Sequence, residues 1–232
     1  MKKAEKWISV AAMFLVILGL LITSFQLAIY GDPEYKFYKK LYEKYQVTES
    51  LDMEMQDVMN VTDHMMAYLI GEEEELSIVT QVDGKEQDFF NEQDRLHMFD
   101  VKNLFLGGLK LRNIWFVSAI VLLMFLAARK ADLKRLIPYA YNIAFLVFIG
   151  IAGFLAAAFA IDFTKCFTIF HEIFFTNDLW LFNPATDYMI RMLPEGFFTD
   201  MVIRIALYFV GMLFAIFAVM QIWKKKIISR TD

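Results

Sequence analysis

Two histidines stand among residues that suit acid–base chemistry. His97 has Asp94 three positions before it and Asp100 three positions after it, in a run with helical periodicity. Residues three apart share a helix face, so a carboxylate there can meet the imidazole, favour its charged form and fix its tautomer. His171 follows Phe167 by four positions and emerges from an aromatic helical face at membrane depth. An ionisable residue in that setting is a candidate functional group.

Each histidine also has a purely structural interpretation, because buried polar groups are normally just hydrogen-bonded. The third histidine, His64, reads as ordinary surface. His171-Glu172 begins an HExxH zinc motif, but Phe175 occupies the place of its second histidine. There is no GxSxG elbow, and Cys166 lacks the context of a thiol nucleophile. Three histidines are too few for a multi-histidine di-iron oxidase, so we expect no metal and no cofactor. The remaining pattern suits a reaction whose substrate carries its own nucleophile.

The elements that position these groups belong to a membrane protein. Of the 232 residues, 58% are hydrophobic, and Phe alone occurs 24 times. A helix needs about 20 apolar residues to cross a bilayer. Long stretches without a charge predict four transmembrane helices at about 7–30, 113–129, 136–161 and 204–223. The predicted fold is therefore an all-α integral membrane protein that forms a single membrane domain over residues 1–232.

The distribution of Lys and Arg predicts the orientation, because cytoplasmic loops are rich in both. Basic residues are dense in 1–6, 130–135 and 224–232, which places both termini in the cytoplasm. The segments 31–112 and 162–203 are then extracytoplasmic. Segment 31–112 holds 18 acidic residues against 9 basic ones. This acidic outer side argues against nucleic acid as a partner.

The outer segments contain further predicted elements. Tyrosines at helical spacing over 35–45 suggest an interfacial helix, and an amphipathic helix is expected over 55–69. Residues 72–84 read as a solvated loop ending in an Asp83-Gly84 turn, and helical periodicity returns over 88–111. Segment 163–182 is too polar for a fifth span and too apolar for a free loop. We interpret it as a re-entrant or interfacial element, with its phenylalanine stripe explained equally well by packing.

Two runs carry a family resemblance. FFNEQDRLHMFDVKNLF (89–105) and FTIFHEIFFTNDLWLFNPATDYMIRMLPEGFFTD (167–200), with the order of spans and loops around them, resemble the family of bacterial lipoprotein intramolecular transacylases. The resemblance covers essentially the whole chain. Glu92 and Asp94 stand where members often show an acidic E-x-E pair, so one side chain differs.

The resemblance implies an acyltransferase of the bacterial cell membrane with an extracytoplasmic active site. Its substrates would be diacylated bacterial lipoproteins held among membrane lipids. The sn-2 acyl chain of S-diacylglyceryl-cysteine would move to the α-amino group, leaving an N-acyl S-monoacylglyceryl (lyso-form) lipoprotein. The α-amine has a pKa near ~8, so a histidine must remove its proton before it attacks. The ester oxygen then needs a proton, and no acyl-enzyme is required.

The two characteristic histidines of the family correspond to His97 and His171. We expect His97, oriented by Asp100, to act as the base and His171 as acid or oxyanion stabiliser, with the reverse assignment open. Candidate supporting residues, each with a structural alternative, are Asp100, Glu172, Lys102, Asn177 and Asn142. Candidate acyl-chain contacts are Phe167, Phe170, Phe174, Phe175 and Trp180, where burial of apolar area supplies the attraction. A non-enzymatic membrane scaffold and a lipoprotein or lipid ester hydrolase are the alternative functions.

Overall fold

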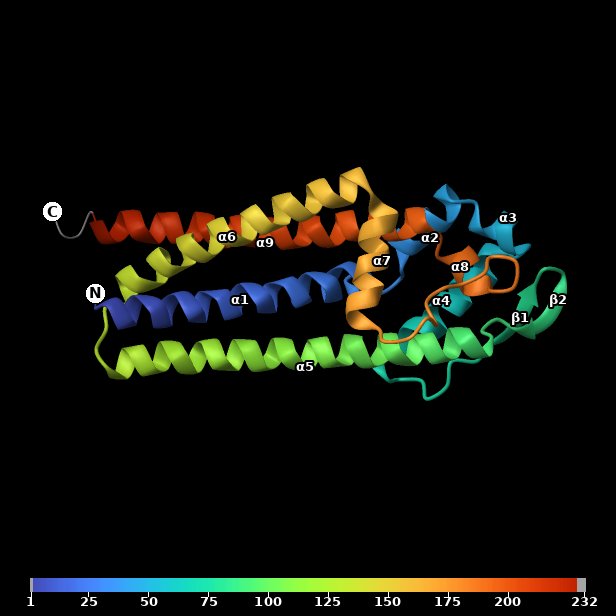
Figure 1. Cartoon of the computed structure of the whole chain (residues 1–232), viewed down its shortest axis with the longest axis horizontal. Coiled ribbons are helices and arrows are strands. Elements are labelled where there is room, and N and C mark those ends of the chain that lie inside the picture. Colours follow the sequence, from blue (N-terminus) through green and yellow to red (C-terminus); the bar gives the residue numbers. More distant parts are fainter. Residues whose placement is uncertain (1, 229–232) are drawn as a thin grey trace. The chain divides into compact units, whose positions relative to one another are not determined.

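The computed structural model describes residues 2–228 and divides them into two compact units. Among the described residues, the first unit comprises 2–31, 109–161 and 203–228, and the second comprises 32–108 and 162–202. Two long helices, α5 (Glu92–Ala128) and α9 (Glu195–Ile228), contribute residues to both units. Figure 1 follows the chain through all of these elements.

The first unit contains the predicted membrane helices. It is built from α1 (Lys3–Tyr30), α6 (Leu133–Ile161) and the C-terminal parts of α5 and α9. Within the described residues these four helices are long and apolar enough to cross a membrane. The four predicted spans are thereby confirmed, although α1, α5 and α9 all begin earlier than the apolar stretches. The chain is a multi-pass membrane protein.

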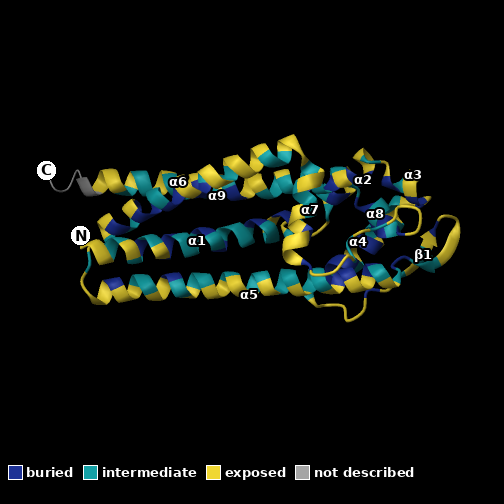
Figure 2. Cartoon of the chain, viewed as in Figure 1, coloured by how far each residue is buried: buried dark blue, intermediate teal, exposed yellow. Residues whose placement is uncertain are grey.

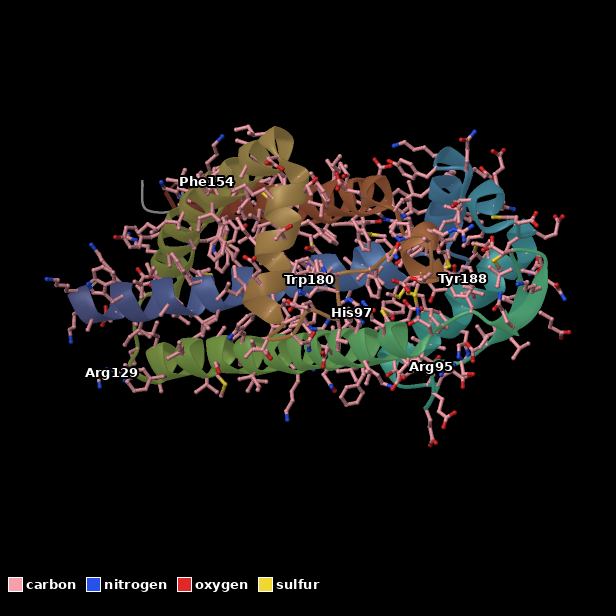
Figure 3. All side chains as sticks on the ribbon, turned by 45° about the vertical axis from the view of Figure 1, so that its right-hand side comes forward. Arg95, His97, Arg129, Phe154, Trp180 and Tyr188 are labelled. Atoms are coloured by element: carbon pink, nitrogen blue, oxygen red, sulfur yellow. The ribbon has the colours of Figure 1, made fainter. Side chains whose placement is uncertain are left out.

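Small and aromatic side chains form the core of this unit. Ala12, Ala140 and Ala144 are fully buried, which allows α1 and α6 to approach closely, and Phe145 stacks on Phe217 with ring centroids 4.5 Å apart. Large apolar side chains point outward instead, and Phe154 is 73% exposed (Figures 2 and 3). In a soluble protein such a surface would aggregate, whereas lipid covers it in a membrane.

The second unit is predominantly helical and contains one small sheet. Its helices are α2 (Lys36–Lys44), α3 (Val47–Leu51), α4 (Met55–Ile70), α7 (Phe163–Phe174) and α8 (Tyr188–Met192), with the first turns of α5 and α9. The interfacial and amphipathic helices predicted over 35–45 and 55–69 correspond to α2 and α4. Tyr42, Leu51, Val58, Phe89 and Met192 are all fully or almost fully buried and form part of its core.

The sheet corrects the expectation of a plain loop before residue 88. Strands β1 (Val79–Val82) and β2 (Lys85–Asp88) pair antiparallel, with Val79 opposite Asp88. The Asp83-Gly84 turn was correctly predicted, and both residues have positive φ angles, 50° and 70°. Those angles suit a two-residue hairpin. The two strands were not predicted because VTQV and KEQD show no alternation of apolar and polar residues. The Asp83-Gly84 turn is therefore the only sequence feature that indicates the hairpin.

Helix α5 is continuous where the sequence suggested a helix and a separate span. Its 37 residues extend about 55 Å, well beyond the ~30 Å apolar thickness of a bilayer. The charge-free part begins only after Arg112. The first turns of α5, which contain His97, therefore precede the charge-free part of the helix.

Asn142 lies in the membrane unit, where it bonds to a neighbouring helix. Gln221 Nε2 on α9 donates to Asn142 Oδ1 on α6 at 2.9 Å. We expect Asn142→Ala and Gln221→Ala each to lower the free energy of unfolding in a bilayer mimic. The double variant should show a coupling of about 0.6 kcal/mol, and at most ~1.7 kcal/mol. Strictly additive losses in a double-mutant cycle would mean that this bond contributes nothing.

Candidate active site

The start of α5 fixes the position of His97. Asn91 and Asp94 form a reciprocal cap: Asn91 N donates to Asp94 Oδ2 at 3.0 Å, and Asp94 N donates to Asn91 Oδ1 at 2.9 Å. Such a capping box satisfies two of the backbone donors that a helix start leaves unpaired. His97 follows one turn later and is 6% exposed. The first turn of α5 thus carries its imidazole into the core of the second unit.

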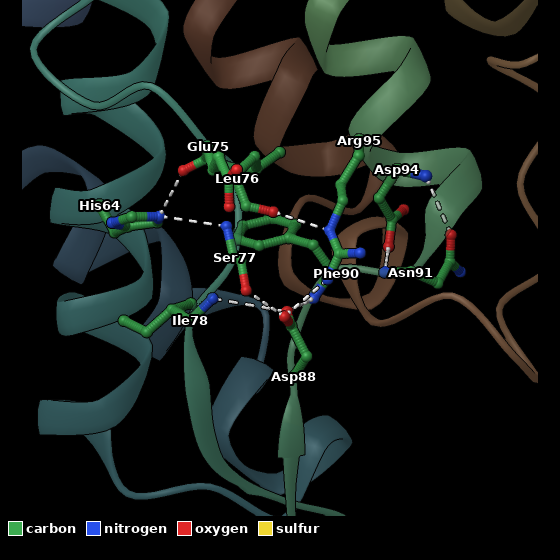
Figure 4. A network of polar contacts seen from close by, with 10 residues as sticks. All are labelled: His64, Glu75, Leu76, Ser77, Ile78, Asp88, Phe90, Asn91, Asp94 and Arg95. Carbon is green, nitrogen blue, oxygen red and sulfur yellow. Dashed lines mark hydrogen bonds and ion pairs between the residues drawn. The ribbon is translucent and has the colours of Figure 1, made fainter.

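The capping carboxylate is itself completely buried. Asp94 is 0% exposed, and burial raises its pKa to about 6, although the Asn91 backbone N–H opposes the shift. Figure 4 shows this carboxylate beside Arg95, whose guanidinium pairs with Asp88 at 2.6 Å. Among the described residues, Asp94 Oδ1 and His97 Nδ1 are the two buried side-chain polar atoms without a hydrogen-bond partner. One ring nitrogen of His97 and one carboxylate oxygen of Asp94 therefore have no hydrogen bond within the described residues.

His171 lies near the end of α7 with a defined proton position. Its Nδ1 is 2.8 Å from the carbonyl oxygen of Phe167, one turn earlier. A carbonyl can only accept, so Nδ1 carries the hydrogen and Nε2 of the neutral ring carries a free lone pair. Phe167 also packs on the ring with centroids 4.2 Å apart, and Trp180 stacks on it at 4.9 Å. The arrangement holds Nε2 of His171 in one orientation.

The tertiary fold brings the two histidine rings together. Their centroids are 6.1 Å apart with an interplanar angle of 28°, although 74 positions separate them in the sequence. Phe175 contacts both rings, at 5.2 Å from His97 and 5.6 Å from His171. Phe182 packs against His97 at 5.3 Å. The two imidazoles therefore share one aromatic enclosure.

This enclosure keeps both rings uncharged. The pKa of His97 is lowered to about 4, chiefly by burial and also by the nearby His171, while Asp100 opposes the shift. Burial also lowers the pKa of His171, against the effect of its bond to the Phe167 carbonyl. Near pH 7 the site presents two neutral imidazoles. Such groups can accept or donate a proton without first losing one to solvent.

The loop over 175–187 forms one wall and is tied to the beginning of α5. Gln93 Nε2 donates to the carbonyl oxygens of Leu179 and Leu181 at 3.0 and 3.1 Å. Asn91 Nδ2 donates to the buried carboxylate of Asp187 at 2.8 Å. Asp187 also accepts from the backbone N–H of Asn183 at 2.6 Å. These bonds position Trp180 and Phe182 against the histidines.

The candidate supporting residues have different surroundings. Asp100 accepts from Asn177 Nδ2 at 2.9 Å, and this pair lines a hollow of about 260 Å³ that also includes Phe175. Lys102 instead donates to the Glu73 carbonyl and lies over the Tyr68 ring. Glu172 is exposed on α7. Of the five candidates, only Asp100 and Asn177 thus line the hollow beside Phe175, whose ring contacts both histidines. Asn142 belongs to the first unit.

The aromatic residues of α7 and of the segment that follows it divide into an inner and an outer set. The inner set, Phe167, Phe175 and Trp180, packs on His171. The outer set, Phe170 and Phe174, is 38% and 51% exposed, and Phe170 also contacts the His171 ring edge-on with centroids 5.4 Å apart. Ile173 is 70% exposed on the same helix. The inner set encloses the histidines, and the outer set offers an apolar surface. A hydrocarbon chain could lie on such a surface.

Sequence reasoning missed several residues that build this site. Gln93, Asp187 and Phe182 gave no local signal, because each acts through a partner more than 80 positions away. Asn91 had a usable signal, since N-x-x-D before an apolar run resembles a capping box.

Among the described residues, no group of three His, Cys, Asp or Glu side chains is arranged to hold a metal ion.

Removing the Asp187 carboxylate should loosen the wall of the site. In Asp187→Ala, the Asn91 side-chain amide and the Asn183 backbone N–H lose their buried acceptor, so we expect a loss of about 1–3 kcal/mol in the free energy of unfolding. Proteolysis within 175–187 should become faster in the folded protein. Asp178→Ala changes an exposed carboxylate in the same loop and serves as the control. Equal cleavage rates in the two variants would contradict a pinning role for Asp187.

Comparisons with known proteins identify the family and the fold of the chain. The family model for the lipoprotein intramolecular transacylase Lit matches residues 10–198. The structure is similar to that of the membrane integral lipoprotein intramolecular transacylase Lit from Bacillus cereus, with a TM-score of 0.79 and 21% identity over 100% of both chains. A variant of that enzyme with a histidine-to-alanine mutation matches with a TM-score of 0.74 and 20% identity, over 99% of this chain and 96% of that one. No curated protein matches by sequence. Because the family model covers most of the chain, this protein belongs to the lipoprotein intramolecular transacylase family.

Proposed function

We propose that this chain moves the sn-2 acyl chain of an S-diacylglyceryl-cysteine lipoprotein onto the α-amino group of that cysteine. Family membership supports the class of reaction. The observation that carries the mechanism is the pair of buried, neutral imidazoles with centroids 6.1 Å apart. Amine and ester belong to one substrate molecule, so the protein has to fold the substrate and manage two protons. Holding reacting groups together can lower a barrier by up to ~7–11 kcal/mol.

We assign the role of base to His171. Its Nδ1 donates to the Phe167 carbonyl, which leaves Nε2 free to accept the proton of the attacking amine. The amine nitrogen forms a bond to the ester carbonyl carbon, giving a tetrahedral intermediate with a negative oxygen. When the bond to the glycerol oxygen breaks, His171 returns the proton to that oxygen. The products are an amide and a free sn-2 hydroxyl, and the enzyme ends in its starting state.

His97 then suits the stabilisation of the oxyanion. Its Nδ1 is buried without a partner, and a buried N–H without an acceptor is rarer than an unpaired acceptor. The favoured neutral tautomer therefore carries its hydrogen on Nε2, as a donor. This reverses the first assignment from sequence, which made His97 the base with Asp100 as its orienting group. The Asp100 side chain is engaged by Asn177 instead.

The orientation of the protein follows from its charges. Lys and Arg are dense in 1–6, 130–135 and 224–232, so these segments are placed in the cytoplasm and the histidines outside. Helix α7 would then be the interfacial element, with Phe170 and Phe174 on an apolar surface for acyl chains. Diacylated lipoproteins are anchored in the same leaflet, so the substrate reaches the site laterally. Membrane lipids surround the protein, and the site uses no cofactor.

Loss of either site histidine should abolish acyl transfer. We expect His97→Ala and His171→Ala to reduce the rate by about 10²–10⁴-fold, the usual contribution of acid–base or oxyanion groups. His64→Ala removes the third histidine and should keep near-normal activity, because His64 contacts the backbone of Glu75 and Ser77 on the exposed surface. Tandem mass spectrometry of a lipoprotein N-terminal peptide measures the transfer of one acyl chain to nitrogen-containing fragments. Loss of an acyl mass would indicate a hydrolase, and unchanged fragments with well-expressed protein would favour a scaffold.

Glutamine substitutions and pH separate the two roles. Glutamine can donate from Nε2 but cannot shuttle a proton, so His97→Gln should retain more activity than His97→Ala, whereas His171→Gln should resemble His171→Ala. In the wild type, kcat/KM should fall as acid protonates His171 in the free enzyme. Because the pKa of His171 is lowered, this acid limb of the pH–rate profile should lie below pH 6.5, the ordinary pKa of histidine. The limb should persist in His97→Gln. The opposite ranking of the glutamine variants would restore His97 as the base.

A further inference from the structure

Helix α2 reverses the charge of the segment that contains it. Residues 31–112 hold 18 acidic and 9 basic residues, yet four of those bases fall within the nine residues of α2, beside the single acid Glu43. They are Lys36, Lys39, Lys40 and Lys44. The basic residues are therefore concentrated at one place in an otherwise acidic segment.

Packing of α2 fixes which side faces outward. Tyr38, Leu41 and Tyr42 are only 3%, 4% and 0% exposed. Tyr42 stacks on Phe197 with centroids 5.8 Å apart, and its hydroxyl is hydrogen-bonded to Thr62 Oγ1 at 2.8 Å. Because these contacts prevent rotation about the helix axis, all four lysines of α2 are exposed. We call this side the lysine face.

Two charges on the lysine face are not used within the chain. Lys44 pairs with Asp200 at 2.5 Å, and Lys36 pairs with Glu34 at 2.9 Å. Among the described residues, the side chains of Lys39 and Lys40 form neither an ion pair nor a hydrogen bond to a protein group. These adjacent ammonium groups are therefore available to an external anion.

The chain keeps α2 near the end of a membrane span. α1 ends at Tyr30 and α2 begins at Lys36. The connecting residues can cover at most about 20 Å when fully extended. A turn in which Tyr35 N donates to the Asp32 carbonyl at 3.0 Å shortens that reach. The half-buried Tyr35 belongs to a residue type that is enriched at the lipid–water interface. The lysine face thus begins within reach of the headgroup layer.

We propose that the lysine face of α2 binds the phosphate groups of anionic phospholipids, chiefly through Lys39 and Lys40. A lysine ammonium is a compact donor that suits phosphate oxygens. The rest of segment 31–112 is acidic and would be repelled by an anionic leaflet, so α2 supplies the local attraction. This inference does not depend on the acyl-transfer mechanism.

Native mass spectrometry of the full-length protein tests it, with phosphatidylglycerol and phosphatidylcholine as the added lipids. Each lysine near a charged lipid surface contributes a factor of about five in affinity. We expect Lys39→Gln/Lys40→Gln to weaken phosphatidylglycerol binding by about 25-fold and to leave phosphatidylcholine binding unchanged. Raising the salt concentration should reduce the difference between variant and wild type.

Two matched variants complete the experiment. Lys39→Arg/Lys40→Arg keeps the charges and should retain phosphatidylglycerol binding, whereas Lys85→Gln removes an exposed lysine on β2 and should behave as wild type. Unchanged phosphatidylglycerol affinity in the glutamine variant overturns the proposal, as does an equal loss in Lys85→Gln. If the glutamine variant changes only the oligomeric state, the face binds a second copy of the chain instead.

Discussion

The site depends on the burial of two uncharged imidazoles in one aromatic enclosure. Water would let both rings titrate near their ordinary pKa, so the enclosure that lowers the pKa of His97 to about 4 also sets its chemistry. The cost is that polar atoms of the rings lose solvent partners. His171 recovers one bond from the Phe167 carbonyl, whereas His97 Nδ1 recovers none. This asymmetry in hydrogen bonding is the basis for the different roles that we propose for the two histidines.

A polar cluster at the start of α5 makes that enclosure possible. Asn91 bonds to Asp94 within the helix cap and to Asp187 across the unit. A few positions later, Gln93 holds the backbone that carries Trp180. The residues that begin the helix thus also close the loop over the histidines. Because buried polar groups are costly when unpaired, the cluster specifies one arrangement of this loop rather than merely adding stability.

The two units differ in how their polar side chains are stabilised. In the membrane unit, polar side chains are few, and Asn142 finds Gln221 on a neighbouring helix. In the second unit, most charged groups lie at the surface; the buried Asp187 carboxylate is hydrogen-bonded, whereas the buried Asp94 keeps one oxygen without a partner. Helix α2 has two different faces, with tyrosines on its buried side and lysine ammonium groups on its exposed side. A basic helix that follows a membrane span within an acidic segment can supply local attraction to an anionic leaflet.

The sequence alone determined the four spans, the helices over 35–45 and 55–69, the Asp83-Gly84 turn and the family, because apolar length, helical periodicity and short motifs are local properties. It also named His97 and His171 as candidates. It did not determine the β1–β2 hairpin, whose strands lack a hydrophobic pattern, or the wall made by Gln93, Asp187 and Phe182. Only the tertiary structure decided which ring nitrogen of His171 is free and that Asp100 is engaged by Asn177. Those facts depend on hydrogen bonds and ring packing between particular atoms, and in most cases the partners lie far apart in the chain.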